Sequence, residues 1–487
     1  MTALNAQHQT DQGNQMIDPI HVDALARIVG PKGSITASDD QMAFVTEWRD
    51  KFVGQTPLVL LPTSTSEVAQ ILAYCNHHQI PVVPQGGNTG LVGGGIPGLE
   101  GSSEILLSTN RMRSFIEVDA HGATLVAEAG VTVSELQDAA AENGLLFGLS
   151  LASEGSCTAG GIVSTNAGGV HVIRYGTARD MTLGIEAVLA DGSIVNELSG
   201  LRKDNTGLAL SNLLAGAEGT LGVITKVCFR LFPAERRHAT AWLAVPDPSA
   251  ALELLRLAKE MSEDQVSVFE FMSRAALEFA FTHIDGCSDP LGTHSQWYVL
   301  LETASASAES ENEQRMASLL EAAVTKGLVT DGALAQSLQQ RQSFWRIRES
   351  ISEAQKLEGG SIKHDISLPL GQLPDFIRNA SRALKDQYPG CRLSPFGHLG
   401  DGNLHFNVMQ PKNADKQQFL GQWEPMNRLV HDLVVEYGGS ISAEHGIGVL
   451  KKSELKRVKP PAELAAMRAI KEALDPNNIL NPRCLFE

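Results

Sequence analysis

The sequence has few cysteines and few aromatic residues, and it lacks both an excess of basic residues and a long hydrophobic run. Its six cysteines lie far apart without a C-x-x-C pair, so there is no sign of a thiolate metal site or a disulfide framework. The 39 Lys and Arg against 56 Asp and Glu give a formal net charge of −17, which disfavours nucleic acid as a partner. Residues 1–15 lack the charged start and apolar stretch of a signal peptide. No run reaches the roughly 18 apolar residues of a membrane span, so we expect a cytoplasmic protein.

The length and composition are those of a globular protein with more than one domain. A chain of 487 residues, 43% hydrophobic and 20% charged, can form about three domain-sized units. Residues 1–54 are expected to form an N-terminal helical segment with helices over 19–27 and 40–46.

Residues 55–233 alternate between strand and helix patterns and are expected to form the first domain. Two helix starts carry capping signals, Ser64 with Glu67 and Thr132 with Glu135. The expected elements are strands over 58–61, 80–84, 123–128 and 223–231, a helix over 65–77 and a hairpin over 185–195.

The second half is expected to hold another domain, over residues 234–422, followed by a helical segment over 423–487. The segment includes a helix that begins at Pro461. The domain mixes two kinds of element, with helices over 250–261 and 307–324 and strands over 297–301 and 405–408.

Two glycine-rich loops in the first domain could hold a phosphorylated ligand. The first, PQGGNTGLVGGG, covers residues 84–95, and its glycines let backbone N–H groups approach a diphosphate. A formal G-x-G-x-x-G match that ends at Gly98 is rejected, because Pro97 falls where the helix would form. The second loop, over 154–180, interleaves glycines with Ser, Thr and Asn, which could satisfy phosphate and ribose oxygens. Either loop alone could be a set of tight turns, but the two together favour a dinucleotide cradle.

The second half contains a candidate metal site. In FGHLGDGNLHFNV, two glycines allow a bend that could bring His398 and His405 together, and ISAEHGIG adds Glu444 and His445. Two imidazoles and a carboxylate are a common ligand set of a catalytic divalent metal. The chain has 14 histidines, however, so ordinary packed histidines are the alternative.

These motifs resemble a known family. PQGGNTGLVGGG, residues 155–180 and GAEGTLGVITKV resemble, in this order, the FAD-binding domain of flavoproteins related to p-cresol methylhydroxylase and vanillyl-alcohol oxidase. FGHLGDGNLHFNV and ISAEHGIG resemble the C-terminal domain of FAD-linked D-2-hydroxyacid dehydrogenases. The implied fold class is α+β: a two-part FAD-binding domain of the p-cresol methylhydroxylase type, then an α+β substrate domain, then a helical C-terminal segment that returns to the flavin.

The resemblance implies FAD, with its pyrophosphate on residues 86–90. Members that bind flavin covalently often carry a histidine in this loop, and Asn88 and Thr89 stand there instead, so we expect non-covalent FAD. His171 is the other candidate for attachment. The expected cofactor-binding residues are Pro84, Gly86, Gly87, Asn88, Thr89, Gly90, Leu91, Ser153, Gly155, Thr158, Gly161, Ser164, Asn166, Gly168, Gly169, Tyr175, Gly176, Glu218, Gly219, Gly222, Ile224 and Asn481.

The resemblance also implies a metal and a base. His398, His405 and Glu444 match the residues that hold the metal, expected to be Zn²⁺, or Mn²⁺ or Co²⁺, and His445 matches the proposed catalytic base. His445 would accept the hydroxyl proton of the substrate while hydride passes from C2 to flavin N5. The alternative is that His445 orients Glu444.

The substrate class is indicated by a third pattern. Arg348 and Ser352 lie four residues apart, on one face of an expected helix, and Lys363 follows fifteen residues after Arg348. This resembles the family members that act on D-2-hydroxyglutarate, where the matching residues grip the distal carboxylate and Asn407 and His445 complete the pocket. A second buried carboxylate needs such partners. Lys363 could instead pair with the nearby Asp365, and Arg346 is interpreted as a solvated residue.

Other functions stay open from the sequence. D-lactate or D-malate could replace D-2-hydroxyglutarate, and the chain could be a non-catalytic flavin subunit of a respiratory complex. The sequence has no NAD-binding fold, haem motif or iron–sulfur cysteines, so the electrons must pass to an external acceptor. The resemblance implies electron-transfer flavoprotein or a quinone, and a homodimer is the assembly to test.

Overall fold

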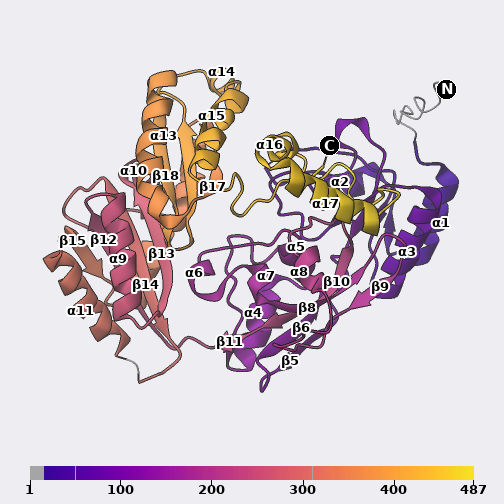
Figure 1. Cartoon of the computed structure of the whole chain (residues 1–487), viewed down its shortest axis with the longest axis horizontal. Coiled ribbons are helices and arrows are strands. Elements are labelled where there is room, and N and C mark those ends of the chain that lie inside the picture. Colours follow the sequence, from indigo (N-terminus) through magenta and orange to yellow (C-terminus); the bar gives the residue numbers. More distant parts are fainter. Residues whose placement is uncertain (1–15, 50, 310, 487) are drawn as a thin grey trace.

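The structure is a computed structural model that describes residues 16–49, 51–309 and 311–486. It has two lobes (Figure 1), and the chain passes from the first lobe to the second after β11 (Phe232–Pro233). Near its C-terminus the chain returns to the first lobe through α16 (Lys452–Val458) and α17 (Pro461–Leu474). Lys471 in α17 fixes this return, because its ammonium donates to the carbonyl oxygen of Thr220 at 2.8 Å.

The first lobe contains two sheets. The smaller has the order β1-β2-β4-β3 and buries its apolar side chains against α1 and α3. Its elements, with the adjacent helices, are α1 (Pro19–Val29), β1 (Ser34–Ile35), α2 (Ser38–Val45), β2 (Val59–Leu60), α3 (Thr65–His78), β3 (Val82–Gln85) and β4 (Ile105–Ser108).

The larger sheet of the first lobe is five-stranded, with the order β5-β6-β10-β8-β9. Its strands are β5 (Ile116–Asp119), β6 (Thr124–Glu128), β8 (Thr182–Val188), β9 (Ile194–Asn196) and β10 (Val223–Arg230). The remaining elements are α4 (Val133–Glu142), β7 (Leu145–Leu146), α5 (Ala159–Ser164), α6 (Val172–Tyr175), α7 (Ala178–Met181) and α8 (Leu210–Leu214). The predicted hairpin is confirmed, since β8 and β9 pair antiparallel.

The two capping predictions have different outcomes. At α4, Thr132 and Glu135 form the full capping box. At α3, the Ser64 hydroxyl accepts from the backbone N–H of Glu67 as predicted. The Glu67 carboxylate, however, accepts from the N–H of Thr63 at 2.6 Å, so only half of this box forms.

The second lobe is built on an eight-stranded sheet with helices packed against it. The order is β15-β12-β14-β13-β18-β19-β16, and β17 also pairs with β19. The strands are β12 (Arg237–Val245), β13 (Val266–Ser273), β14 (Trp297–Ser305), β15 (Asp331–Leu334), β16 (Ser361–Ile362), β17 (Asp365–Ser367), β18 (Arg392–His398) and β19 (Asn403–Met409). The helices are α9 (Pro248–Met261), α10 (Arg274–His283), α11 (Asn312–Thr325), α12 (Leu338–Leu357), α13 (Leu373–Gln387), α14 (Lys416–Leu420) and α15 (Trp423–Glu436).

Helix α15 lies in the second lobe, although the sequence placed it with the segment that returns to the flavin. Met426, Val430 and Val434 are buried in the same apolar cluster as Phe376 of α13. These residues share one face of α15, and burying that face stabilises the helix here. The return to the first lobe therefore begins after α15.

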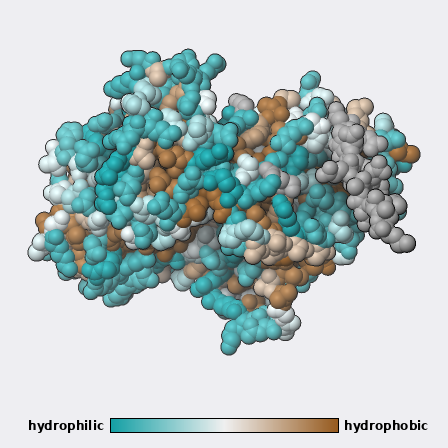
Figure 2. All heavy atoms as spheres, turned by 45° about the horizontal axis from the view of Figure 1, so that its top comes forward, coloured by the Kyte–Doolittle hydropathy of each residue, from teal (hydrophilic) through white to brown (hydrophobic). Residues whose placement is uncertain are grey.

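The surface is mixed in character. Figure 2 shows hydrophilic side chains over most of one face, with hydrophobic side chains scattered among them. Within the described ranges, no helix combines the length and the apolar character needed to span a membrane.

Candidate functional site

A β-hairpin brings His398 and His405 together. His398 ends β18, His405 lies in β19, and the two strands pair antiparallel with Phe396 opposite His405. The turn between them needs Gly402, whose φ is +88° and whose added Cβ would lie 2.4 Å from the carbonyl oxygen of Leu368. The centroids of the two imidazole rings are 5.6 Å apart. The sequence predicted a bend within one segment, and the structure achieves the same convergence with two paired strands.

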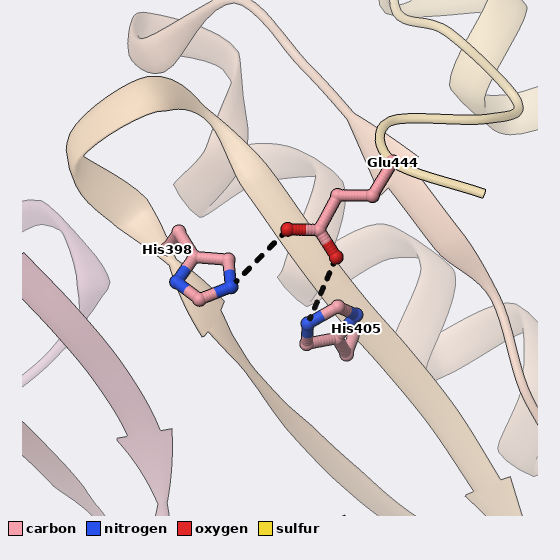
Figure 3. Close-up of side chains that lie close together, drawn as sticks. All are labelled: His398, His405 and Glu444. Carbon is pink, nitrogen blue, oxygen red and sulfur yellow. Dashed lines mark ion pairs between the residues drawn. The ribbon is translucent and has the colours of Figure 1, made fainter. Parts of the chain in front are cut away.

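Glu444 completes this group from a separate loop (Figure 3). Its Oε1 lies 3.4 Å from His398 Nε2 and its Oε2 lies 3.9 Å from His405 Nε2. The three candidate ligand atoms all lie within 4.8 Å of one another. Two imidazole nitrogens and one carboxylate oxygen at this spacing fit one divalent metal ion.

The three groups differ strongly in their tendency to hold a proton. Burial raises the pKa of Glu444 to about 7, against the opposing effect of His398. Burial would lower the pKa of His398, but the Glu270 carboxylate beside it raises that pKa to about 9. Burial lowers the pKa of His405 to about 3, so this imidazole is neutral and able to bind a metal.

Asp365 holds the loop that carries Glu444 and His445. Its Oδ2 accepts from the backbone N–H of Glu444 at 2.9 Å and of His445 at 3.0 Å. The same oxygen lies 3.4 Å from His445 Nδ1. Asp365 is buried, yet His445 and His405 hold its pKa below the ordinary range, so it is ionised. Burial lowers the pKa of His445, which favours a neutral imidazole with its Nδ1–H toward Asp365.

The surroundings of His445 bear on its two interpretations. Its Nδ1 faces Asp365, and its Nε2 makes no hydrogen bond to any residue that the structure describes. Among the described residues no hydrogen bond joins His445 to the Glu444 side chain, although ligand atoms of Asp365, Glu444 and His445 all lie within 4.8 Å of one another. A neutral imidazole with a free Nε2 can accept a proton.

Arg348 is buried and close to His398, because both side chains contact Glu270. Its Nε donates to Glu270, and its guanidinium carbon lies 5.0 Å from the ring centroid of Phe396. Ser352 lies one turn further along α12 and is exposed. The solvated interpretation of Arg346 agrees with its exposure, although it also donates to the Asp285 carbonyl oxygen at 2.7 Å.

Lys363 lies between β16 and β17 and does not pair with Asp365. Across the part of the chain that is described, its ammonium makes no hydrogen bond or ion pair. Burial, together with the charges of Arg49 and Lys356, lowers its pKa to about 8. Lys363 is thus a partly buried cation without a counter-charge among the described residues.

Asn407 lies on the same side of β19 as His405, as the two-residue period predicts. Its Nδ2 donates to Gln355 Oε1 on α12 at 2.9 Å. Phe406 between them faces the opposite way and packs against Phe376 of α13, with ring centroids 5.4 Å apart.

The three predicted cofactor motifs meet in the first lobe. A Cβ at Gly87 would lie 1.8 Å from the carbonyl oxygen of Ser156, so the first two glycine-rich loops are in backbone contact. Gly219 has a φ of +72°, and a Cβ there would lie 3.1 Å from the ring of Pro84. The close approach of all three motifs therefore requires glycine at these positions.

The residues present at this junction fit FAD. Thr158 Oγ1 is buried and has no hydrogen-bond partner, and a Cβ at Gly86 would lie 2.6 Å from it. An unpaired buried hydroxyl beside glycine backbone is suited to a phosphate oxygen. Asn88 ties this loop to the N-terminal segment, since its Nδ2 donates to the carbonyl oxygens of Ala43 at 3.1 Å and Thr46 at 2.9 Å.

The other predicted cofactor residues lie on the same loops, on α5 and around the start of β10. Those are Thr89, Gly90, Leu91, Ser153, Gly155, Gly161, Ser164, Asn166, Gly168, Gly169, Gly176, Gly222 and Ile224. Tyr175 has a different contact, because its hydroxyl donates to Glu235 at the start of the second lobe.

Asn481, near the C-terminus, lies against two of the predicted cofactor motifs. Its Nδ2 donates to the carbonyl oxygens of Gly94 at 2.9 Å and Glu218 at 2.8 Å. The Glu218 carboxylate in turn accepts from the N–H groups of Ile447 at 2.8 Å and Gly448 at 2.7 Å. Glu218 and Asn481 therefore connect the cofactor motifs to the loop that carries Glu444 and His445.

The sequence analysis did not identify Glu270 as a site residue. The sequence feature that could have identified it is a charged residue in the centre of the apolar segment VSVFEFMS, which forms a strand in which every residue is buried. A buried charge must be paired, so such a position predicts a polar network. The partners could not be named from the sequence, because His398 is 128 residues away.

Comparisons with known proteins agree with this structure. Residues 56–197 match a family described as "FAD binding domain", and residues 234–485 match one described as "FAD linked oxidases, C-terminal domain". Among solved structures, p-cresol methylhydroxylase with substrate bound has a TM-score of 0.71 at 16% identity, covering 96% of both chains. An alkyldihydroxyacetonephosphate synthase has a TM-score of 0.72 at 17% identity, covering 99% of this chain and 88% of the other.

Several curated proteins are similar over nearly the whole chain. D-2-hydroxyglutarate dehydrogenase of Stutzerimonas stutzeri (strain A1501) is 35% identical, covering 97% of this chain and 100% of that protein. The mitochondrial D-2-hydroxyglutarate dehydrogenase of Arabidopsis thaliana is 39% identical, with 96% and 81% covered. A putative mitochondrial D-lactate dehydrogenase of Schizosaccharomyces pombe (strain 972 / ATCC 24843) is 36% identical, with 95% and 89% covered. The predicted fold and the predicted relationship are confirmed, and the chain belongs to the family of FAD-linked oxidases.

Proposed function

We propose that this protein is an FAD- and divalent-metal-dependent dehydrogenase that oxidises D-2-hydroxyglutarate to 2-oxoglutarate. The observation that carries the proposal is the uncompensated Lys363 in a site that also holds Arg348 and a metal-ligand group. A partly buried cation without a partner is costly unless a ligand supplies the opposite charge. The distal carboxylate of a dicarboxylate substrate supplies it.

Separate residues would hold the metal ion and accept the proton. When bound, FAD accepts hydride from C2 of the substrate, and a divalent ion polarises the 2-hydroxyl group. His398, His405 and Glu444 would hold the ion. His445 accepts the hydroxyl proton at Nε2, and Asp365 stabilises the imidazolium that forms, because its carboxylate already faces Nδ1.

The distal end of the substrate is bound by cations. Arg348 and Lys363 donate to its carboxylate, and charge-assisted hydrogen bonds of this kind are about twice as strong as neutral ones. Ser352, exposed on the same face of α12 as Arg348, adds a hydroxyl donor. Asn407, adjacent to the metal-ligand His405 on its strand face, completes the pocket.

D-lactate is the second candidate, favoured by the similarity to the Schizosaccharomyces pombe protein. Its methyl group would leave Lys363 without a carboxylate and the two Nη atoms of Arg348 without an acceptor. The dicarboxylate therefore accounts for more of the pocket than the monocarboxylate does.

Anaerobic bleaching of the protein's own flavin tests the proposal. D-2-hydroxyglutarate, D-lactate and D-malate are added to the holoprotein, before and after treatment with EDTA. We expect rapid bleaching by D-2-hydroxyglutarate that EDTA abolishes and Zn²⁺, Mn²⁺ or Co²⁺ restores. Bleaching by D-lactate alone would overturn the substrate assignment, and a flavin that no substrate reduces would support a non-catalytic subunit.

The electron acceptor is proposed from the family resemblance. We expect the reduced flavin to pass its electrons to electron-transfer flavoprotein or to a quinone. Reoxidation of substrate-reduced protein by each acceptor, followed by stopped flow, distinguishes them. Mass measurement in solution tests the homodimer.

A further inference from the structure

Glu270 is one buried carboxylate that touches two parts of the site. It lies in β13, opposite His398 across the β13–β18 pair, and is 0% exposed. One oxygen, Oε1, contacts His398 Nδ1, and the other, Oε2, accepts from Arg348 Nε. A metal-ligand histidine and a substrate-binding arginine are therefore held by the same side chain.

The contact with His398 fixes the state of that imidazole. An ionised carboxylate can only accept, so Nδ1 carries a hydrogen, and Nε2 is the nitrogen that a metal ion would bind in place of a proton. Nε2 is the atom that faces Glu444, at 3.4 Å. A carboxylate behind a histidine ligand orients the ring and increases its basicity toward a metal.

The contact with Arg348 leaves the outer edge of the guanidinium available. Only Nε is used, and Nη1 and Nη2 make no hydrogen bond to residues in the described ranges. Phe396 packs 5.0 Å from the guanidinium carbon and restricts its position further. Two fixed, parallel N–H donors are the arrangement that binds a carboxylate in a bidentate manner.

We propose that Glu270 is a positioning residue that couples metal binding to recognition of the distal carboxylate of the substrate. The substrate half of this inference rests on the proposed function. Without the carboxylate, His398 loses the acceptor that fixes its ring, and Arg348 becomes a buried cation free to change its rotamer. One substitution at Glu270 should therefore weaken both properties, although Glu270 touches neither the metal nor the substrate.

Glu270→Gln tests this in the FAD-loaded protein. The amide keeps the size of the side chain, but it has only one oxygen. Its NH₂ group therefore faces either His398 Nδ1 or Arg348 Nε, both of which are donors that need an acceptor. Zn²⁺ affinity is measured by chelator competition without substrate, and we expect it to fall about 10- to 100-fold. We also expect the KM for D-2-hydroxyglutarate to rise more than that for D-lactate, and the absorption bands of Co²⁺-loaded protein to shift.

Glu302→Gln is the matched control. Glu302 is also 0% exposed, lies in the neighbouring strand β14 and pairs with an arginine, Arg341, at 2.7 Å, but does not touch the site. It should lose stability without changing Zn²⁺ affinity or the KM ratio. An equal loss of Zn²⁺ affinity in Glu302→Gln would show a general effect of buried charge and overturn the inference.

The remaining outcomes are equally decisive. Unchanged Zn²⁺ affinity in Glu270→Gln overturns the inference even if the wild type oxidises D-2-hydroxyglutarate. A change in only the Zn²⁺ affinity, or in only the KM for D-2-hydroxyglutarate relative to D-lactate, overturns the proposed coupling of metal binding to substrate recognition. If the wild-type protein does not oxidise dicarboxylates, the proposed function is wrong. The Zn²⁺ measurement needs no substrate, so it still tests the effect of Glu270 on His398. If Glu270→Gln does not fold, Glu270→Asp replaces it in the test. The aspartate keeps the charge but is one methylene too short to reach both His398 and Arg348, so we expect the same loss of Zn²⁺ affinity and the same rise in the KM for D-2-hydroxyglutarate.

Discussion

Asp365 and His445 are joined twice, through the backbone and through the side chain. Asp365 Oδ2 accepts the His445 N–H at 3.0 Å and lies 3.4 Å from its Nδ1. The two contacts set both the position of the residue and the orientation of its ring. Asp365 Oδ2 also accepts from the Glu444 N–H at 2.9 Å, so the proposed base and one proposed metal ligand are placed together.

We predict that Asp365→Asn slows flavin reduction by about 10²-fold or more, because the amide no longer stabilises an imidazolium at His445. The rate is measured by anaerobic stopped flow at saturating substrate. Bound flavin and metal content are measured in parallel, and a normal rate with both retained would contradict the role given to Asp365.

His445→Gln should lower the same rate by about 10²- to 10⁴-fold while leaving metal bound, because it removes the proton acceptor and no metal ligand. His398→Ala provides the contrast, since it should lose metal as well as activity. The prediction is wrong if His445→Gln loses metal to the same extent as His398→Ala.

Lys363→Ala should raise the KM for D-2-hydroxyglutarate about 10- to 100-fold, the equivalent of one charge-assisted hydrogen bond. The KM for D-lactate should be nearly unchanged, because that substrate has no distal carboxylate. Arg346→Ala, an exposed arginine of the same region, serves as the control for a general loss of positive charge. An equal effect on both substrates would argue against a distal-carboxylate pocket.

The affinity for dicarboxylates should depend on pH through Lys363. Burial, with Arg49 and Lys356 nearby, lowers the pKa of Lys363 to about 8. The free protein holds a charged Lys363 below this pH and a neutral one above it, so the KM for D-2-hydroxyglutarate should rise as the pH increases through this range. The KM for D-lactate should not show this step, and parallel pH profiles for the two substrates would contradict the prediction.

Gly87→Ala should lower both the unfolding temperature of the apoprotein and its FAD content. Its Cβ would lie 1.8 Å from the Ser156 carbonyl oxygen, so the first two glycine-rich loops would be forced apart. Gly90→Ala is the control for the fold, because a Cβ there meets nothing within 4 Å. Equal stability of the two apoprotein variants would contradict the described loop contact.

Much of the site could be predicted because its residues stand in short motifs. His398 and His405 are linked by a glycine-containing turn, and Glu444 and His445 are adjacent in the chain, so local sequence was sufficient to propose them. Elements with strong periodicity or caps, such as α3 and the β8–β9 hairpin, were predicted nearly to their ends.

The rest depends on contacts between distant segments. Glu270 stands in no motif, and its meaning appears only when β13 pairs with β18. The place of α15 was also hidden, because an amphipathic helix does not specify which apolar surface it covers. Arg348 was predicted to bind the distal carboxylate of the substrate, but its buried partner Glu270 could not be predicted from the sequence.

The amide of Asn481 has a consequence for the order in which the protein matures. It bonds to carbonyl oxygens in two of the cofactor motifs, and the neighbouring Leu480 pairs with Val82 beside the first glycine-rich loop. The contact with Gly94 joins residues 387 positions apart, and the contact with Glu218 joins residues 263 positions apart. During translation, the ribosome therefore releases the groups that close the flavin cradle long after the glycine-rich loops have emerged. We therefore expect flavin to bind late in biosynthesis, after residues 479–481 have emerged and can make these contacts.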